Sequence, residues 1–360
     1  MKNIQTTRRP YLDDLRWGTV VLVALYHVFY IFNAVTPGMM PFAAVQYQDG
    51  AQYLLYPWFM ILLFVIAGMC ARYALETRSL RDFIRTRTRR LLVPSTIGVL
   101  VFGWVQGGIS MAIAGAFENI SGSVPVPVMF LIQCLSGTGV LWFIQMLWLF
   151  SMLLALVRRF EKGRLYAFTS RCGVIAALLL GVPVWLFGQI GNTPVIAVYR
   201  FGIYGFTFFL GYFVFAHDEV IDRLAAARIP LLLAAAVLGG VYLVRHFGDN
   251  YAVMPVVGCV LATAYGWVAV LALLGAGKAW LGRGGAVSHW MTQHEFGLYV
   301  FHYLPLSAAA FLLRRADVPA LPCYLLTAVA AFAGAFLLEA VISRIPVLRW
   351  CILGIKKPGA

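Results

Sequence analysis

The first apolar segment of the chain carries two ionisable residues, Arg16 and His27, eleven positions apart. Eleven residues of α-helix turn through about 1,100°, within about 20° of a whole number of turns, and rise about 16 Å. Both side chains therefore point to one face, which suits an anionic molecule that passes an arginine and approaches an imidazole general base. The alternative is a histidine satisfied by a neighbouring helix and an arginine that extends to the surface. Asp13, three residues before Arg16, can orient its guanidinium or pair with another basic residue.

Four arginines crowd the segment FIRTRTRRLLVP, Phe83–Pro94. They are Arg85, Arg87, Arg89 and Arg90. Guanidinium groups bind phosphate oxygens in a bidentate manner, so this density favours a phosphate-binding surface. The same density is typical of cytoplasmic loops of membrane proteins, where lysine and arginine collect. The arginine content by itself leaves both interpretations open.

A second polar stripe is predicted in HEFGLYVFHYLP, His294–Pro305. Glu295 and His302 are seven residues apart, within about 20° of one helix face, and Tyr299 lies about one turn from each. This stripe would contact a substrate, although a helix-end glutamate and interfacial aromatic residues give the same pattern. Trp142, in GTGVLWFIQMLW, is a further candidate for substrate contact, with an interfacial tryptophan as the alternative.

The elements that must position these residues are membrane-spanning helices. Hydrophobic residues make up 62% of the 360 residues and charged residues only 12%, whereas a soluble domain has about a quarter charged. The apolar runs are about 20 residues long, the length that crosses a hydrocarbon core of about 30 Å. We predict an all-α polytopic membrane protein in which residues 1–360 form a single transmembrane domain. The ten predicted spans are residues 17–35, 53–71, 93–116, 138–157, 173–191, 199–216, 229–245, 252–275, 294–313 and 320–342.

The distribution of lysine and arginine predicts that both termini lie in the cytoplasm. With the N-terminus and every second loop assigned to that side, all but four of the 28 Lys and Arg lie there. This predicts a multi-pass protein of the cell (inner or plasma) membrane, with Glu118–Pro127 as an exterior loop because it is rich in Gly, Ser and Pro. The same rule accounts for the net charge of +14, so no nucleic-acid partner is expected. The four exceptions are Arg200, Arg245, Arg314 and Arg315.

The sequence argues against a cleavable signal peptide, a disulfide framework and a metal site. The polar, basic segment before residue 17 and the long apolar run after it do not form a cleavable signal. The six cysteines are scattered without a CxxC pattern, as expected of small buried hydrophobic residues. His289 and His294 are five residues apart without a matching acidic or cysteine pattern, so no metal site is predicted.

Six segments, in order along nearly the whole chain, together resemble the acyltransferase 3 family of membrane-bound acyltransferases. The first is LDDLR followed by His27, in which an arginine and a histidine are separated by ten residues. In RTRRLLVP, Arg87 and Arg90 are similar to an RxxR pattern before a proline. The last segment contains Tyr299 and His302 as a tyrosine-x-x-histidine element. The other segments are FMILLFVIAG (Phe59–Gly68), LWFIQML (Leu141–Leu147) and FFLGYFV (Phe208–Val214), and the last segment is FGLYVFHYLPL (Phe296–Leu306).

The resemblance implies transfer of an acyl group from cytoplasmic acyl-CoA, such as acetyl-CoA or succinyl-CoA, to a hydroxyl of an acceptor. The acceptor is expected to be extracytoplasmic or membrane-associated, such as a glycan or a lipid. The resemblance implies that His27 acts as general base, or through a transient acyl-histidine, and that Arg87 and Arg90 hold the CoA head group. The C-terminal stretch and the spacing of RTRR resemble the glucan biosynthesis protein C branch, which implies succinyl transfer to glucans.

A polytopic transporter or lipid flippase is the alternative function, because buried ionisable groups can also line a substrate pathway. Inverted repeats and Gly- or Pro-broken helices in matching halves, which many transporters show, are not visible in the sequence. Membrane lipids are expected partners in either case. A homo-oligomer is compatible with the sequence, because lipid-facing and partner-facing apolar surfaces look alike.

Overall fold

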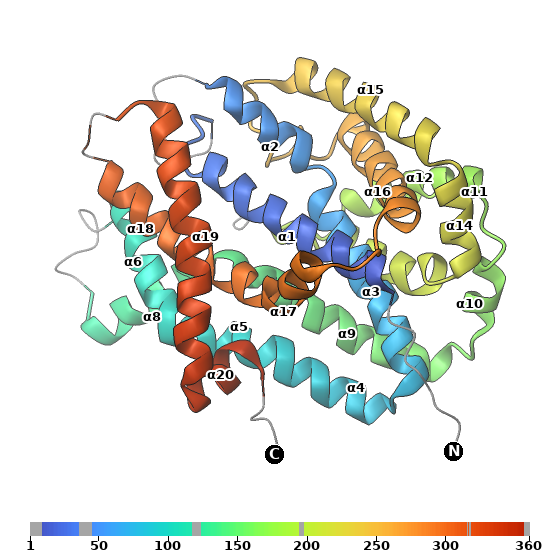
Figure 1. Cartoon of the computed structure of the whole chain (residues 1–360), viewed down its shortest axis with the longest axis horizontal. Helices are drawn as coiled ribbons and strands as arrows, with labels where there is room; N and C mark the ends of the chain where they lie inside the picture. The colour runs from blue at the N-terminus through green and yellow to red at the C-terminus, as the bar shows by residue number, and fades with distance from the viewer. Residues whose placement is uncertain are drawn as a thin grey trace. The chain divides into compact units, whose positions relative to one another are not determined.

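The computed structural model describes residues 9–35, 45–116, 124–193, 198–314, 316 and 318–355. Within these residues all regular secondary structure elements are helices, and most of them are α-helices (Figure 1). Two short elements, η1 and η4, are 3₁₀-helices, and three, η2, η3 and η5, are π-helical. The predicted all-α class is therefore confirmed.

Six helical stretches of the described chain are long and apolar enough to cross a membrane. A seventh is formed by α17 (Ala286–Phe301) and α18 (Tyr303–Leu313), which meet at a bend of 48°. Three shorter apolar stretches, Val126–Ser136, Val174–Gly188 and Phe201–Phe215, accompany them. This set confirms a multi-pass membrane protein and is consistent with about ten spans. The six long stretches are Tyr47–Thr77, Leu80–Ile113, Gly139–Phe160, Arg228–His246, Val260–Trp280 and Ala320–Arg344.

The chain divides into two compact units, and α1 (Pro10–Tyr30) and α9 (Trp142–Phe160) each contribute to both. The first unit comprises the described residues of Met1–Thr19, Tyr53–Thr86 and Leu149–Thr292. The single domain predicted from the sequence stays a prediction. The other helices of the first unit are α3 (Phe59–Thr77), most of α4 (Leu80–Arg87), α10 (Arg164–Thr169), α11 (Val174–Leu179), α12 (Gly181–Gly188), α13 (Phe201–Leu210), η5 (Gly211–Phe215), α14 (Asp218–Ala226), α15 (Arg228–His246), α16 (Val260–Trp280) and the start of α17.

The second unit comprises the described residues of Val20–Gln52, Arg87–Trp148 and Gln293–Ala360. Helix α2 (Gly50–Leu55) begins in this unit and ends in the first. The second unit also contains the end of α17 and all of α18. Its other helices are η1 (Tyr47–Asp49), η2 (Thr88–Leu92), α5 (Val93–Gly98), η3 (Val99–Gly103), α6 (Trp104–Ile113), α8 (Val126–Ser136), η4 (Gly139–Leu141), α19 (Ala320–Arg344) and α20 (Pro346–Leu353).

Close helix packing in the first unit explains two of the glycine-containing motifs. A Cβ on Gly68 of α3 would lie 2.0 Å from the Phe208 carbonyl oxygen, and a Cβ on Gly211 would lie 2.1 Å from the Val65 carbonyl oxygen. The two backbones therefore approach each other at both glycines, as small residues allow in membrane helices. Segments FMILLFVIAG and FFLGYFV thus form one interface, between α3 and the α13–η5 run.

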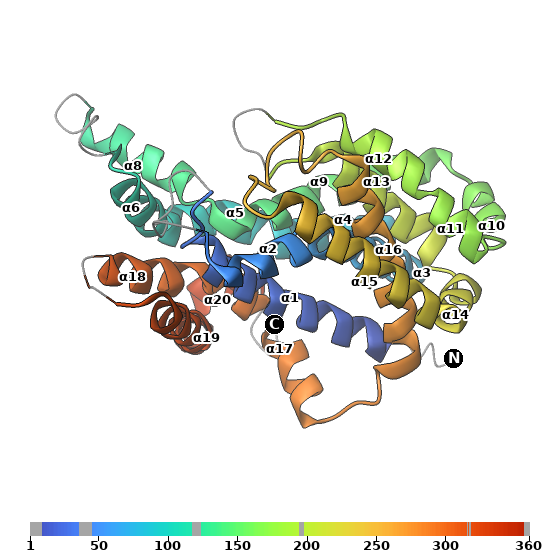
Figure 2. The same cartoon turned by 90° about the horizontal axis from the view of Figure 1, so that it is seen from above.

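In the second unit, α18 lies along α19 and α6 lies along α8 (Figures 1 and 2). Val28 near the end of α1, with Ile31 and Phe32 just after the helix, packs into the first of these pairs. Their buried partners include Leu306 of α18 and Tyr324 of α19. This apolar packing fixes the second half of α1 against α18, and His27 lies in that half.

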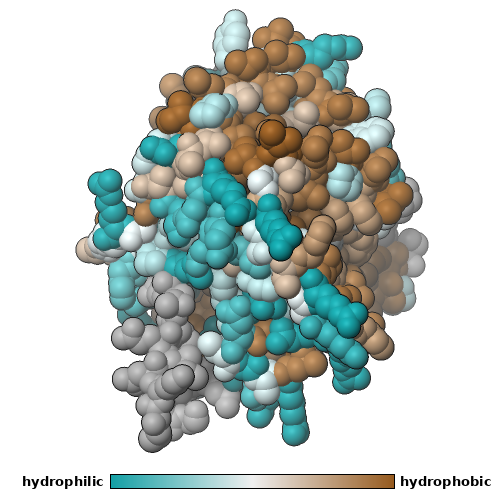
Figure 3. Space-filling model, turned by 90° about the vertical axis from the view of Figure 1, so that its right-hand side faces the viewer, coloured by the Kyte–Doolittle hydropathy of each residue, from teal (hydrophilic) through white to brown (hydrophobic). Residues whose placement is uncertain are grey.

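Exposed apolar side chains are expected where helices face lipid. Figure 3 shows hydrophobic side chains over much of the upper part of one face and hydrophilic side chains gathered in its lower part. Large apolar residues of α15, among them Leu233, Val237 and Val244, are exposed to more than half of their full surface. A soluble protein would bury most of such a helix, so these surfaces fit contact with the hydrocarbon core.

The predicted exterior loop Glu118–Pro127 lies partly outside the described residues. Its last part includes Pro125, the N-cap of α8, and the first turn of that helix. Helix α8 has 11 residues, too few to cross a bilayer, and was not predicted as an element. Proline at its start is favourable, because the first helical N–H groups have no intrahelical acceptor.

Candidate active site

Two histidines from distant parts of the sequence, His27 and His302, are hydrogen-bonding neighbours in the second unit. His302 Nε2 lies 3.2 Å from His27 Nδ1, and the ring centroids are 5.1 Å apart. His27 belongs to α1, and His302 lies between α17 and α18 with 0% of its surface exposed. The motifs predicted a role for each residue separately, and only the fold brings the two rings together.

Backbone carbonyls determine which nitrogen of each ring carries the proton. His302 Nδ1 lies 3.0 Å from the Leu298 carbonyl oxygen and 2.9 Å from that of Tyr299. Carbonyl oxygens only accept, so this nitrogen donates, and Nε2 of the neutral His302 ring is an acceptor. His27 Nδ1 lies 2.8 Å from the Val23 carbonyl oxygen and therefore donates as well, to that oxygen and to His302 Nε2. The remaining nitrogen, His27 Nε2, then carries a lone pair, as a general base requires.

The bend between α17 and α18 places His302. Pro305 has no N–H, so the Phe301 carbonyl receives no hydrogen bond from it, and the proline ring crowds the preceding turn. The two helices consequently meet at 48° immediately before and after His302. The helical path nevertheless continues around the bend, because the His302 N–H donates to Leu298 and the His302 carbonyl accepts from Leu306. The segment FHYLP thus forms a bent span with a histidine at its corner.

Three residues that the motifs did not single out form a hydrogen-bonded chain that begins beside His27. The Tyr303 ring centroid is 5.0 Å from that of His27, and the Tyr303 hydroxyl is hydrogen-bonded to Ser307. Gln106 of α6 donates from Nε2 to Ser307 Oγ over 3.0 Å. Gln106 is 3% exposed, and its Oε1 accepts no hydrogen bond from the described residues. The only signal for it in the sequence was a glutamine within an apolar run.

The other predicted substrate contacts lie in the same unit. The Tyr299 hydroxyl donates to the Val140 carbonyl, and its backbone carbonyl accepts from His302 Nδ1, so Tyr299 belongs to the histidine cluster. Trp142 is buried at the start of α9, and Glu295 is buried on α17. Neither Trp142 nor Glu295 hydrogen-bonds His27, whose hydrogen bonds to the described residues all involve Nδ1.

Arg16 and Asp13 form an ion pair in the first half of α1. Arg16 Nη2 lies 3.2 Å from Asp13 Oδ1, three residues earlier on the same helix. The neighbouring Asp14, whose role the LDDLR pattern did not predict, accepts from the Gly282 N–H over 2.8 Å and from the Ser288 hydroxyl. Asp14 therefore ties the start of α17 to α1 within the first unit.

The arginine segment changes helix type along its length. Arg87 ends α4, and Arg89 and Arg90 lie in the π-helical turn Thr88–Leu92. Pro94 follows in the first turn of α5 and cannot donate to the Arg90 carbonyl, so a wider turn accommodates the missing bond. Two arginines of RTRR are therefore presented from a π turn and not from a regular helix, a detail that the RxxR pattern did not predict.

The start of α9, with the segment LWFIQMLW, holds this turn in place within the second unit. Trp148 Nε1 donates to Thr88 Oγ1 over 3.1 Å. Gln145 Nε2 donates to the Ser95 carbonyl oxygen over 3.1 Å. Gln145 of LWFIQML and the adjacent Trp148 thus support the helical stretch that carries the arginines.

The C-terminal end of α20 lies against the same arginines. Gly354 terminates α20 with a positive φ of 64°, and a Cβ there would lie 3.2 Å from the Arg89 carbonyl oxygen. Arg89 Nε is buried and donates to no acceptor among the described residues. Arg85, the fourth predicted arginine, is exposed on α4 and belongs to the first unit.

The chain matches a family model described as an acyltransferase domain over residues 9–340. This match covers most of the chain and every predicted site residue. The chain belongs to the acyltransferase 3 family. No curated protein and no solved structure matches it.

The protein is therefore a membrane-bound acyltransferase, as the resemblance in the sequence implied. The family match does not reach the level of a branch, so the glucan acceptor stays a prediction. Among the residues that the structure describes, no group of three or more His, Cys, Asp and Glu side chains could hold a metal ion. The candidate residues described above carry imidazole, hydroxyl, amide, carboxylate and guanidinium groups.

Proposed function

We propose that this acyltransferase moves an acyl group, acetyl or succinyl, from cytoplasmic acyl-CoA to a hydroxyl of an extracytoplasmic or membrane-associated acceptor such as a glycan. The observation that carries this proposal is the His27–His302 pair, because its hydrogen bonds leave the lone pair of His27 on Nε2. That nitrogen is the general base of the proposed reaction. His302 is a positioning residue, which acts through His27.

In the proposed reaction, the acceptor hydroxyl gives its proton to His27 Nε2 as its oxygen bonds to the acyl carbon. The C–S bond of the thioester then breaks, and the CoA sulfur leaves with the electron pair and takes the proton from the imidazolium. While His27 is charged, its Nδ1–H donates to the Val23 carbonyl and to His302 Nε2, and hydrogen bonds to a charged group are stronger than those between neutral groups. On the acyl-His27 route the same lone pair attacks the acyl carbon, the C–S bond breaks, and the CoA thiolate leaves with the electron pair. The acceptor hydroxyl then bonds to the acyl carbon, the bond from Nε2 breaks, and the thiolate takes up the hydroxyl proton.

The CoA head group carries several negative charges, and the arginine segment supplies donors for it. We assign this role to Arg87, Arg89 and Arg90, with Arg85 and Arg16 as further cations. The buried Nε of Arg89, which lacks an acceptor among the described residues, supports an anionic ligand at this turn. Asp13 would keep Arg16 oriented through their ion pair.

The acceptor would lie near the polar groups around His27. Gln106 Oε1 is a buried acceptor without a donor in the described chain, so it fits a second hydroxyl of the acceptor. Glycans carry neighbouring hydroxyls and therefore suit this arrangement. Tyr299, Trp142 and Glu295 remain proposed substrate contacts.

The test is thiol release from acetyl-CoA and from succinyl-CoA by detergent-purified protein, with extracted membrane glycans and lipids as acceptors. We expect His27→Gln to abolish release and the exposed His289→Gln to leave it unchanged. A radiolabelled acyl group that stays on the wild-type protein, and not on His27→Gln, after rapid denaturation at neutral pH would favour the acyl-histidine route. If neither donor is bound or consumed, the proposal that acetyl-CoA or succinyl-CoA is the acyl donor is wrong.

A further inference from the structure

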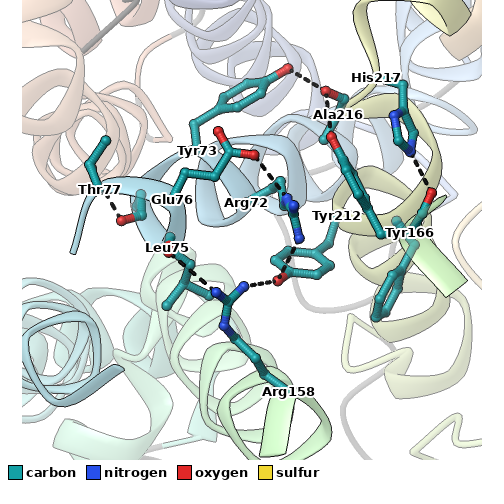
Figure 4. Close-up of polar contacts among 12 residues, drawn as sticks. Arg72, Tyr73, Leu75, Glu76, Thr77, Arg158, Tyr166, Tyr212, Ala216 and His217 are labelled. Atoms are coloured by element: carbon teal, nitrogen blue, oxygen red, sulfur yellow. Dashed lines mark hydrogen bonds and ion pairs between the residues drawn. The ribbon is translucent and has the colours of Figure 1, made fainter. Parts of the chain in front are cut away.

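A second cluster of cationic side chains lies in the first unit, at the ends of α3 and α9 (Figure 4). Arg158 Nη1 donates to the Tyr212 hydroxyl oxygen over 2.7 Å, and Arg72 Nη1 approaches the same oxygen at 3.5 Å. The two Nη1 atoms are therefore no more than about 6 Å apart. Two guanidiniums from different helices thus converge on one phenol.

The cluster holds more hydrogen-bond donors than acceptors. Glu76 accepts from Arg72 Nε over 3.0 Å, and the Leu75 carbonyl oxygen lies 3.4 Å from Arg158 Nη2. Each guanidinium has five N–H groups, so donors of both arginines remain without an acceptor in the described residues. The Tyr212 hydroxyl oxygen accepts from both arginines, and its own proton is donated to no acceptor in the described chain, although Tyr212 is only 1% exposed.

The charge of the cluster is unbalanced. Two guanidiniums face one carboxylate, that of Glu76, within hydrogen-bonding distance. Glu219 also lies within electrostatic range of the nearby Tyr166 ring, but it is exposed and hydrogen-bonds none of these residues. A net positive cluster beside a buried hydroxyl donor is a site for an anion.

Aromatic packing holds Arg72 in place. Its guanidinium carbon lies 3.6 Å from the centre of the Tyr166 ring, and the His217 ring stacks on Tyr166 with their centres 3.8 Å apart. His217 Nε2 lies 2.8 Å from the Tyr166 carbonyl oxygen and donates to it. Stacking of this kind suits arginine and fixes its planar group before a ligand arrives. With 17% of its side chain exposed, Arg72 remains accessible from one side.

We propose that Arg72, Arg158 and Tyr212 bind a phosphate group. One phosphate can accept from two guanidiniums at this separation, and the phenol proton supplies a third donor. The phosphate could belong to an anionic phospholipid head group or to a soluble phosphate. This site is separate in the sequence from the RTRR segment, and it requires neither acyl-CoA nor His27.

The experiment measures binding by the thermal unfolding midpoint of detergent-purified full-length protein, since a ligand that binds only the folded state raises that midpoint. The protein is titrated with phosphatidylglycerol, with phosphatidylcholine and with inorganic phosphate, and potassium chloride of equal ionic strength serves as the blank. Arg158→Gln is compared with Arg159→Gln, an exposed neighbour that makes no hydrogen bond or ion pair with the described residues. Tyr212→Phe is the second variant, because it keeps both positive charges.

We expect a phosphate-bearing probe to stabilise the wild type and Arg159→Gln, with an apparent affinity at least about tenfold weaker in Arg158→Gln. Tyr212→Phe should weaken the same probe by a smaller factor. Stabilisation by phosphatidylglycerol and not by inorganic phosphate identifies a lipid, and the reverse identifies a soluble phosphate. If no probe stabilises the wild type, or if Arg158→Gln and Arg159→Gln respond equally, the proposal is wrong. Should Arg158→Gln fail to fold, an unchanged response of Tyr212→Phe overturns it.

Discussion

Replacement of His302 by asparagine removes one nitrogen of the histidine pair and keeps the other. In the wild type, His302 Nδ1 lies 3.0 Å from the Leu298 carbonyl oxygen and 2.9 Å from that of Tyr299. The asparagine amide nitrogen takes the place of Nδ1 and can still donate to both carbonyls. Nothing takes the place of Nε2, so His27 Nδ1 loses the acceptor at 3.2 Å. The Val23 carbonyl at 2.8 Å remains and preserves the tautomer.

The expected size of the effect follows from the charge that His27 acquires. A hydrogen bond to a charged group contributes about 1.5–3 kcal/mol, and each 1.4 kcal/mol of barrier is about tenfold in rate. We therefore expect kcat for acyl transfer to fall by about 10- to 150-fold in His302→Asn. The KM for acyl-CoA should stay within about twofold, because His302 hydrogen-bonds no residue of the arginine segment among those described.

The assay is thiol release with saturating acetyl-CoA or succinyl-CoA, for wild type, His302→Asn, His302→Gln and the exposed control His289→Asn. Glutamine reaches the position of Nε2 with an oxygen that can accept, so His302→Gln should recover part of the lost kcat. Thermal unfolding of each variant separates loss of positioning from loss of the fold. If His302→Asn retains wild-type kcat, or if the asparagine and glutamine variants lose activity equally, the hydrogen bond between the rings does not matter for catalysis.

Two further predictions test the surroundings of the site and the packing of the fold. Gln106→Leu removes the buried amide beside Ser307 and should lower the acceptor-dependent rate by about tenfold. Slow hydrolysis of acyl-CoA without acceptor should continue at the wild-type rate. Equal loss of both rates would contradict a role of Gln106 in acceptor binding. Gly68→Ala places a Cβ against the Phe208 carbonyl oxygen and should destabilise the protein by about 1–3 kcal/mol, read as a lower unfolding midpoint in detergent. Gly240→Ala, where a Cβ meets open space in α15, is the matched control and should leave the unfolding midpoint unchanged or raise it. If both variants lower the midpoint by similar amounts, the packing argument is wrong.

Much of the fold was predictable because membrane helices obey a length rule. In lipid the backbone N–H and C=O groups must hydrogen-bond within the helix, so each apolar run of about 20 residues predicts one membrane-spanning helix. The predictions failed to include α8, because its 11 residues are too few to satisfy that rule. The bend of the ninth predicted span was also missed, although Pro305 was its signal.

The sequence by itself determined the class of protein, the family and the residues most suited to chemistry, His27 and His302 among them. These features depend on composition, on helical spacing and on residue type, all of which are local along the chain. Only the tertiary structure decided that the two imidazoles meet, that Gln106 donates to Ser307, and that Arg158 and Arg72 share Tyr212. Such contacts join residues far apart in sequence, and they depend on how helices pack. The apolar faces of different helices have similar compositions, so the sequence does not show which faces pack together. That choice depends on how their side chains interdigitate in three dimensions.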